Sequence, residues 1–423
     1  GEPHDGRMGL QPLVRWVSLS ARAPDGIAHD WETRPFEEAE RIQWETLLDL
    51  LEFAGQRSPF YRESLHPVTS REDFLRLPLL ERRHLHGQPE RLLTGPLEDA
   101  VVLRSGGSTG DPKYCFLSPQ DYRADVLCGV KMLRALGIRP GDRCANLFLS
   151  GDLYGSFLSI HRVLEESGVV NFPFTSGAPL DSLRLHFERF GIQAVLGVSA
   201  FLSRLLPDLR APSLRTVVYG GEPLPQSERE RLGRLGIERI GSLLGANDGG
   251  PIGYQCAHCR GSVHHLASDH ILLEILEGEL VITCLNRRLM PLIRYRLGDR
   301  GRWIPGPCDC GRTTPRFELL GRADDLLCLA STNTAWSDVA ALVPGPVQLV
   351  AEKRDGIDCL RVLAECDADP DALRQALLER LPVLRARLDE GLLAELTVEV
   401  GPPGWLLRHP RSGKLVRVVD RRV

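Results

Sequence analysis

The chain has 423 residues, of which 43% are hydrophobic and 26% charged, and its 52 Lys and Arg against 56 Asp and Glu leave a net charge of -4. These values are typical of globular proteins and exclude a disordered chain, a collagen and a polybasic nucleic-acid binder. The length predicts two or three folded units. No apolar run reaches the roughly 18 residues that span a bilayer, and the N-terminus lacks the apolar core of a secretion signal. We therefore expect a cytoplasmic protein with no membrane or nucleic-acid partner.

Residues 8 to about 95 are expected to form helices joined by polar turns, because WETLLDLLEFAG and similar segments carry apolar residues at helical spacing. From about residue 100 to TVVYGGE, short apolar β-like runs alternate with helical segments. This alternation predicts an α/β fold with mainly parallel sheets flanked by helices. Residues 271 to 304 are denser in strands and Gly turns, which predicts a β-rich subdomain over about 250–322.

The pattern of strand-like and helical segments changes again after LLGRADDLL. Two strand-like segments, one long helix over PDALRQALLERLPVLRARL and a last strand predict a small, mobile α+β domain. The sequence thus predicts a large N-terminal domain over 1–322 and a small C-terminal domain over 323–423.

The segment LRSGGSTGDPKY follows the first of these β-like runs, AVVLRS. Its adjacent Gly residues permit positive φ angles, so that successive N–H groups can converge on an anion, while hydroxyls and a lysine add donors and charge. This pattern predicts a polyphosphate loop, although a Gly- and Ser-rich surface turn would have the same letters. The loop is not a P-loop, because no Lys-Ser/Thr pair follows at the required offset. Its candidate residues are Ser105, Gly106, Gly107, Ser108, Thr109, Gly110 and Lys113.

Lysine is rare: the chain has four Lys against 48 Arg. Where Arg prevails, a remaining Lys can mark a place that needs a compact ammonium. Lys113 and Lys414 lie close to Gly and are candidates for phosphate chemistry. Lys131 and Lys353 lie in surface-like contexts and need no special role.

Six segments in order resemble the adenylate-forming enzymes, the superfamily of acyl-CoA synthetases, peptide-synthetase adenylation domains and luciferases. The resemblance is strongest to the phenylacetate-CoA ligase-like branch and runs from about residue 77 to the C-terminus. The segments are RSGGSTGDPK for the phosphate loop, VVYGGEPL for the adenine turn, SLLGANDGG for the aromatic-Gly-x-Thr-Glu segment, PLIRYRLGDRGRW for the ribose Gly-Asp, LLGRADDLL for the interdomain hinge and HPRSGKLVR for the catalytic-lysine loop.

The resemblance implies that a carboxylate attacks the α-phosphate of ATP to give an acyl-adenylate and pyrophosphate. It places Thr109 and its loop neighbours on the β- and γ-phosphates with Mg²⁺. Asp299 would bind both ribose hydroxyls, and Arg322 would reach the ribose or phosphate region. Lys414 would stabilise the charge of the transition state between the carboxylate and the α-phosphate. The adenine side would be formed by Gly220, Gly221, Glu222, Pro223, Leu244 and Gly245.

This chain departs from the family pattern at two places. Leu244 replaces an aromatic residue, Asn247 replaces a Thr, and Asp248 replaces the Mg²⁺-binding Glu. Asn247 and Asp248 are therefore the catalytic candidates of this segment, and the carboxylate of Asp248 is on a side chain one methylene shorter than that of Glu. After the hinge, Ser331 stands at a Gly position and Trp336 replaces a Pro, which would narrow the passage for pantetheine. The domains would rotate about Asp324 or Asp325.

These departures favour an acceptor other than free CoA: an amine, another small nucleophile or the pantetheine of a carrier protein. Members of the branch in aromatic secondary metabolism, such as the phenazine pathway, resemble this pattern. The acid pocket is predicted to be lined by Tyr154, Phe174, Gly220, Ala246 and Asn247. Aromatic and small residues together suit a flat aryl acid. The alternatives are an aryl-CoA ligase and a non-catalytic nucleotide-binding member. The acid itself and the oligomeric state, a homodimer included, stay open.

The eleven Cys are an odd number and predict no disulfide framework. Two pairs, Cys256 with Cys259 and Cys308 with Cys310, have the C-x2-C and C-x-C spacings of a structural, tetrahedral Zn²⁺ site. One of His258, His264, His265 and His270 could replace a Cys ligand, and metal-free thiols are the alternative. The other cysteines are expected to be small buried hydrophobes: Cys115, Cys128, Cys144, Cys284, Cys328, Cys359 and Cys366.

Overall fold

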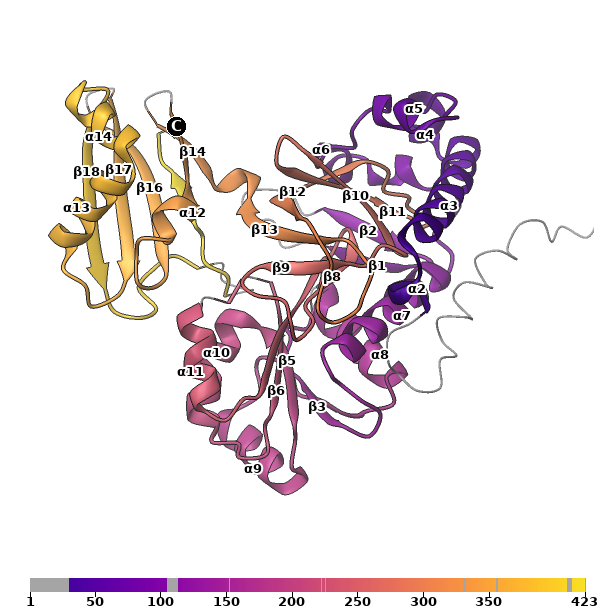
Figure 1. Cartoon of the computed structure of the whole chain (residues 1–423), viewed down its shortest axis with the longest axis horizontal. Coiled ribbons are helices and arrows are strands. Elements are labelled where there is room, and N and C mark those ends of the chain that lie inside the picture. The colour runs from indigo at the N-terminus through magenta and orange to yellow at the C-terminus, as the bar shows by residue number, and fades with distance from the viewer. Residues whose placement is uncertain are drawn as a thin grey trace, which may run out of the picture. The chain divides into compact units, whose positions relative to one another are not determined.

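The computed structural model describes residues 30–104, 113–151, 153–221, 223–224, 226–329, 332–354, 357–408 and 413–422 (Figure 1). The chain divides into two compact units. The large unit holds the residues up to 297 together with 302–319, and the small unit holds 298–301 together with 320–423.

One mixed sheet of eleven strands runs through the large unit in the order β10-β11-β12-β13-β9-β8-β7-β6-β5-β3-β4. The strands are β3 (Arg143–Asn146), β4 (Val170–Pro173), β5 (Ala194–Val198), β6 (Thr216–Gly220), β7 (Arg239–Ala246), β8 (Gly250–Tyr254), β9 (Val263–Leu266), β10 (Ile271–Leu276), β11 (Glu279–Cys284), β12 (Tyr295–Ile304) and β13 (Arg316–Arg322). From β4 to β7 the neighbouring strands are parallel, whereas β7 pairs with β8, β8 with β9, and β9 with β13 in antiparallel fashion. The predicted parallel sheet and β-rich subdomain are therefore one continuous sheet.

Helices cover both faces of the parallel strands. Along β6, Val217 and Tyr219 belong to one core cluster with residues of α9 (Leu180–Phe190), α10 (Ser199–Leu209) and α11 (Gln226–Arg234). Val218 lies between them and belongs to a different cluster, with residues of α7 (Pro119–Ala135) and α8 (Gly155–Glu166), as expected when successive side chains alternate between the faces of a strand. The α/β fold class predicted from the sequence is confirmed.

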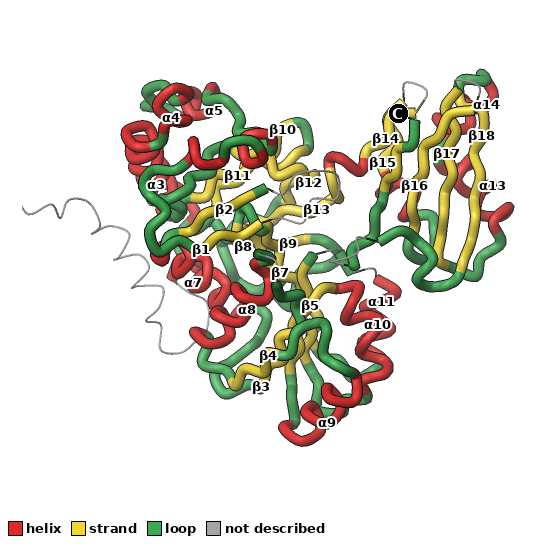
Figure 2. The backbone as a smooth tube through the Cα atoms, turned by 180° about the vertical axis from the view of Figure 1, so that it is seen from behind, coloured by secondary structure: helices red, strands yellow, loops and turns green. Residues whose placement is uncertain are grey.

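Short helices around one long helix cover the antiparallel end of the sheet at β10 and β11 (Figure 2). Leu47 and Leu50 of the long helix pack in one core with Ile271 and Ile282. The helices are α2 (Asp30–Thr33), α3 (Phe36–Arg57), α4 (Pro59–Ser64), α5 (Arg71–Arg76), α6 (Arg83–His86) and the 3-10 helix η1 (Pro89–Leu92). Among the described helices, none combines the length and the apolar composition that crossing a membrane requires.

The strand before the predicted phosphate loop differs from expectation. β1 (Val101–Arg104) lies outside the large sheet and pairs with β2 (Tyr114–Leu117) in a two-stranded antiparallel ribbon. The sequence did not predict β2 as a strand. The ribbon brings the two ends of the intervening segment together, since Arg104 faces Tyr114 in its register.

The small unit contains a four-stranded sheet in the order β18-β17-β16-β19 and a ribbon of β14 and β15. Its predicted long helix is two helices, because Pro382 cannot continue the first and instead begins the second. The elements are the 3-10 helix η2 (Ala323–Asp325), β14 (Leu326–Leu329), β15 (Thr332–Ala335), α12 (Trp336–Ala340), β16 (Val347–Arg354), β17 (Ile357–Glu365), α13 (Pro370–Arg380), α14 (Pro382–Asp389), β18 (Leu393–Gly401) and β19 (Val418–Asp420).

Candidate functional site

The two ends of the predicted phosphate loop meet the same turn of the large unit. The loop residues Ser105, Gly106, Gly107, Ser108, Thr109 and Gly110 lie outside the described residues. At the entrance, the carbonyl oxygen of Arg104 accepts a hydrogen bond of 3.1 Å from Nδ2 of Asn247. At the exit, Lys113 donates to the carboxylate of Asp248. Both catalytic candidates of the turn after β7 therefore contact residues that flank the loop.

The carboxylate of Asp248 is buried, with a side chain only 5% exposed, and its contacts come from the chain itself. Lys113 Nζ and the Tyr295 hydroxyl both donate to Oδ2, the latter at 2.6 Å, and Lys113 also lies 3.1 Å from that hydroxyl oxygen. Burial would raise the pKa of Asp248, but Lys113 and the two hydrogen bonds hold it below its ordinary value. The group is therefore a carboxylate at neutral pH.

A second buried ionic cluster supports the backbone of Asp248. Arg287 is 1% exposed and donates to the Asp248 carbonyl oxygen at 2.6 Å and to Oδ2 of Asp125 at 2.7 Å. His270 Nε2 lies 2.8 Å from Oδ1 of Asp125. Burial would raise the pKa of Asp125, but Arg287 and His270 hold it low. A side chain at Gly250, which has φ +70°, would collide with both partners, since a Cβ there would lie 2.7 Å from each.

Sequence reasoning missed Tyr295, Arg287 and the pairing of His270 with Asp125. His270 was a candidate zinc ligand, but in the structure it binds this carboxylate. Tyr295 stands inside the segment PLIRYRLGDRGRW, which was the one available signal. Arg287 and His270 lie 162 and 145 residues from Asp125 along the chain, and no local pattern marks these pairs.

On the adenine side, Gly220 ends β6 beside the buried ring of Phe148. A Cβ at Gly220 would lie 3.4 Å from that ring and 3.4 Å from the Leu243 carbonyl oxygen, which leaves little room for a larger side chain. Gly221 follows with φ +93°, a backbone conformation that favours Gly. Leu244 and Gly245 lie on β7 and pair with β8, Pro223 is exposed, and Glu222 lies outside the described residues.

The predicted acid-pocket residues fall in two environments. Tyr154 is the N-cap residue of α8 and lies near Arg104, because the carbonyl oxygen of its neighbour Leu153 accepts a hydrogen bond of 2.9 Å from the backbone N–H of Arg104. Ala246 ends β7 directly before Asn247. Phe174 instead packs in the aromatic cluster of α9, with its ring 5.6 Å from that of His186. Tyr154 and Ala246 thus border the site, and the contacts of Phe174 are those of core packing.

In the small unit, the two ribose candidates face each other. Arg322 NH1 lies 3.4 Å from Oδ1 and 3.5 Å from Oδ2 of Asp299. The Asp299 side chain is 16% exposed and that of Arg322 is 36% exposed, so both can be reached from solvent.

The hinge and the lysine segment are linked within the small unit. Asp325 accepts a hydrogen bond of 2.7 Å from Arg417, whose guanidinium lies 4.3 Å from the ring centroid of Trp336. Lys414, three residues before Arg417, is half-buried, and the next residue, Leu415, forms a β-bridge with Arg408. Asp325 thus belongs with the lysine segment. Ser331 and the side chain of Asp324 lie outside what the structure describes.

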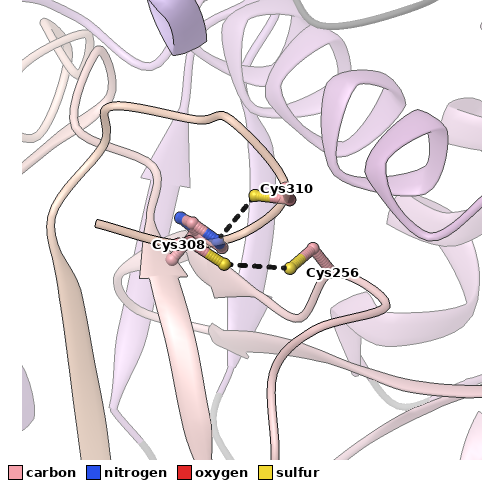
Figure 3. A group of neighbouring side chains, drawn as sticks. Cys256, Cys308 and Cys310 are labelled. Atoms are coloured by element: carbon pink, nitrogen blue, oxygen red, sulfur yellow. Dashed lines mark hydrogen bonds between the residues drawn. The ribbon is translucent and has the colours of Figure 1, made fainter. Parts of the chain in front are cut away.

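The paired cysteines converge in the large unit (Figure 3). Figure 3 shows Cys256, Cys308 and Cys310 pointing toward one another. With His265 they form a group whose ligand atoms all lie within 4.8 Å of one another. Cys256 Sγ lies 3.7 Å from Cys308 Sγ, and Cys310 Sγ lies 3.4 Å from His265 Nε2. Cys259 Sγ is 3.6 Å from Cys256 Sγ but does not belong to that mutually close group.

Neighbours outside the group orient His265. Its Nδ1 lies 3.0 Å from Oγ1 of Thr314, so that Nε2 faces the sulfurs. Its ring stacks on the ring of Tyr254, with 5.6 Å between the two centroids. The turn after Cys310 also anchors α2, because Thr313 donates its N–H to the Glu32 carbonyl oxygen at 2.7 Å. His264 is buried, and its Nδ1 faces Ser262 at 2.8 Å.

Two smaller expectations are corrected in part. Lys131 was expected at the surface, but it is 8% exposed and paired with Asp269, because the long lysine stem of α7 packs inward and only a carboxylate offsets the buried charge. Of the seven single cysteines, Cys366 is half-buried and the side chain of Cys328 lies outside the described residues. The remaining five are buried as predicted: Cys115, Cys128, Cys144, Cys284 and Cys359.

Known proteins resemble the chain over nearly its whole length. It is 28% identical over 445 aligned positions to a phenylacetate-coenzyme A ligase of Thermus thermophilus, which covers 92% of this chain and 98% of that protein. It is 25% identical to an indoleacetate-lysine synthetase of Pseudomonas savastanoi, over 82% of this chain and 90% of that protein. A solved 2-hydroxyisobutyryl-CoA ligase in the postadenylation state matches with a TM-score of 0.74 at 22% identity, covering 93% and 92% of the two chains. No family model matches.

The fold and the relatives define the class: this is an adenylate-forming enzyme fold. Within that superfamily, the sequence relatives support the phenylacetate-CoA ligase-like branch, the resemblance that the motifs predicted.

Proposed function

We propose that the protein is an ATP-dependent ligase that activates an aryl carboxylic acid as its acyl-adenylate. A carboxylate oxygen attacks the α-phosphorus of ATP, the bond from that phosphorus to the bridging oxygen of the β-phosphate breaks, and pyrophosphate leaves. The observation that carries the proposal is the contact of Arg104 and Lys113, which flank the predicted phosphate loop, with Asn247 and Asp248. A loop fixed at both ends beside a buried carboxylate suits a metal-bound triphosphate.

Residues of both units have roles in this proposal. Asp299 has two oxygens that accept hydrogen bonds from the ribose hydroxyls, and its contact with Arg322 supports its orientation. Lys414 offsets the charge that develops between the attacking carboxylate and the α-phosphate. In the large unit, Tyr154 and Ala246 border the acid.

Asp248 fits Mg²⁺ because its carboxylate supplies hard oxygens and is buried in a fixed position. When bound, the ion neutralises charge on the phosphate oxygens. The Asp248 side chain is held by Tyr295 and its backbone by Arg287, so this chain presents the carboxylate in one orientation.

For the second step we propose a nucleophile other than free CoA, with an amine or a carrier-protein thiol as the candidates. Trp336 supports this choice, because its indole is fixed by a 2.8 Å hydrogen bond to the Val347 carbonyl oxygen and by Arg417. A bulky side chain held by two contacts therefore stands where the CoA ligases have a Pro. The phenylacetate-coenzyme A ligases among the relatives favour a second candidate, transfer to CoA itself.

The experiment measures pyrophosphate release from Mg·ATP with a panel of aryl acids, and then identifies products by mass after CoA or free amines such as lysine are added. We expect release with at least one aryl acid and an amide or carrier thioester as product. Robust acyl-CoA formation would overturn the acceptor proposal and leave adenylation intact. Binding of ATP without pyrophosphate release for any acid would overturn both.

We also propose that Cys256, His265, Cys308 and Cys310 hold a structural Zn²⁺. Two sulfurs at about 2.3 Å from one tetrahedral ion are about 3.8 Å apart, close to the 3.7 Å between Cys256 and Cys308. Thr314 on the far ring nitrogen is the outer contact that a zinc-bound His usually has. The ion would fix the turn that anchors α2, away from the reacting groups.

Elemental analysis of matched variants tests this ligand set. We expect one Zn²⁺ per chain in the unaltered protein and in Cys259→Ser, and less in His265→Ala and Cys308→Ser. Loss of zinc in Cys259→Ser with retention in His265→Ala would show that the fourth ligand is Cys259 and not His265. A protein purified in the presence of zinc that holds none would reject the site.

A further inference from the structure

Asp248 is already paired with a cation of its own chain. Lys113 Nζ and the Tyr295 hydroxyl donate to the same oxygen, Oδ2, and Nζ lies 5.7 Å from the centroid of the Tyr295 ring. The Lys113 side chain is 13% exposed and that of Asp248 is 5% exposed, so water screens the pair little. Any divalent ion on this carboxylate therefore meets the charge of Lys113 at close range.

The ammonium of Lys113 has two competing partners, the carboxylate of Asp248 and a phosphate oxygen of the nucleotide. Its backbone is fixed, because Tyr114 begins β2 directly after it. Its ammonium is on a flexible four-carbon stem, and it ends the segment predicted to bind phosphates. The ammonium can therefore exchange Asp248 for a phosphate oxygen by rotating its side chain, while the ribbon of β1 and β2 stays in place.

We propose that Lys113 is a placeholder cation, which occupies Asp248 until the nucleotide phosphates attract it and the carboxylate receives the metal that arrives with the nucleotide. This proposal rests on the proposed function, because it takes Asp248 as the metal ligand. It makes metal and nucleotide binding mutually dependent, since each ligand improves the site for the other. The site thereby takes up the divalent ion together with ATP rather than alone.

Binding of Mn²⁺ to the full-length, zinc-loaded protein without nucleotide tests the placeholder, with free Mn²⁺ measured by electron paramagnetic resonance. We expect Lys113→Met and Lys113→Gln to bind Mn²⁺ about 10-fold or more tightly than the unaltered protein, the usual size of a neighbouring charge's effect on a carboxylate. Lys113→Arg keeps the charge and should not gain affinity. Circular dichroism checks that each variant folds.

Two further variants locate the effect. Lys113→Met combined with Asp248→Asn should lose the gain, which assigns the ion to Asp248 rather than to another site. Tyr295→Phe removes the neutral donor from the same oxygen but keeps the ammonium, so it should bind Mn²⁺ no more than about 2-fold more tightly, since removal of a neutral donor leaves the charge repulsion in place. A non-hydrolysable ATP analogue should raise the Mn²⁺ affinity more in the unaltered protein than in Lys113→Met.

Equal Mn²⁺ affinity in the unaltered protein and in both neutral variants would overturn the placeholder, and so would a gain that survives Asp248→Asn. Pyrophosphate release by the unaltered protein separates this failure from failure of the proposed function. Release together with unchanged Mn²⁺ affinity would reject the placeholder alone, whereas absence of release would reject adenylation.

Discussion

Two buried polar clusters of the large unit are built on opposite principles. Around Asp248 and Asp125, each carboxylate has a cationic partner from the chain, Lys113 for the first and Arg287 for the second. In the cysteine cluster the donors face one another: Cys256 Sγ has its contacts with the sulfurs of Cys259 and Cys308. Folding alone pairs the charges of the ionic cluster, whereas the cysteine cluster is the proposed Zn²⁺ site. The first should respond to removal of a partner and the second to removal of an ion.

The largest effect is expected for Asp125→Ala. It leaves Arg287 charged and unpaired in the interior, and breaking such a buried pair typically costs about 3–5 kcal/mol. The free energy of unfolding, measured by urea denaturation, should fall by this amount. As a control, Glu45→Ala removes one partner of an exposed ion pair with Arg41 and should change the free energy of unfolding by less than about 0.5 kcal/mol. Equal small losses in both variants would show that the ionic cluster is not a structural unit.

Lys414→Ala should affect rate rather than stability, because Lys414 belongs to neither cluster. Loss of one preorganised donor costs about 2.7–4 kcal/mol of transition-state stabilisation, so pyrophosphate release should slow by roughly 100- to 1000-fold. Lys353→Ala changes an exposed lysine of the same unit and should leave the rate unaltered. A loss of less than about 10-fold in Lys414→Ala would contradict the assigned role.

Removal of the proposed Zn²⁺ should lower the free energy of unfolding and leave the proposed pyrophosphate release in place. At free zinc 100 times above its dissociation constant, binding contributes about 2.7 kcal/mol to folding, and a chelator removes it. Because Thr313 fixes Glu32, limited proteolysis near α2 should accelerate after chelation. Pyrophosphate release is measured after the chelator has been removed and Mg²⁺ has been added back. Loss of release under these conditions, with a constant unfolding midpoint, would place the zinc in the chemistry.

The smallest effect is expected for Asn247→Ala. This variant removes one neutral hydrogen bond to the Arg104 carbonyl oxygen, which typically contributes about 0.5–1.5 kcal/mol. Thermal unfolding should register this loss, and the KM for ATP should rise because the entrance of the phosphate loop is less well fixed. An unchanged KM would mean that the contact serves packing alone.

The sequence predicted what local patterns encode. Alternating apolar runs predicted the α/β class. Short spacings predicted Cys256, Cys259, Cys308 and Cys310 as partners, whereas the mutually close group has His265 in place of Cys259. The sequence could not predict contacts between distant segments, such as Arg287 with Asp125, because nothing near either residue marks the other. Lys131 was misjudged for the same reason, since its burial depends on Asp269, 138 residues away.

Isotope transfer tests the central claim most directly. In adenylation an oxygen of the acid becomes the bridging oxygen of the acyl-adenylate, and it stays with AMP when a nucleophile displaces the acyl group. With an aryl acid labelled with ¹⁸O in its carboxylate and an accepted nucleophile, mass analysis should find one ¹⁸O in each AMP released. Unlabelled AMP, or label in inorganic phosphate or pyrophosphate, would contradict attack of the acid on the α-phosphate.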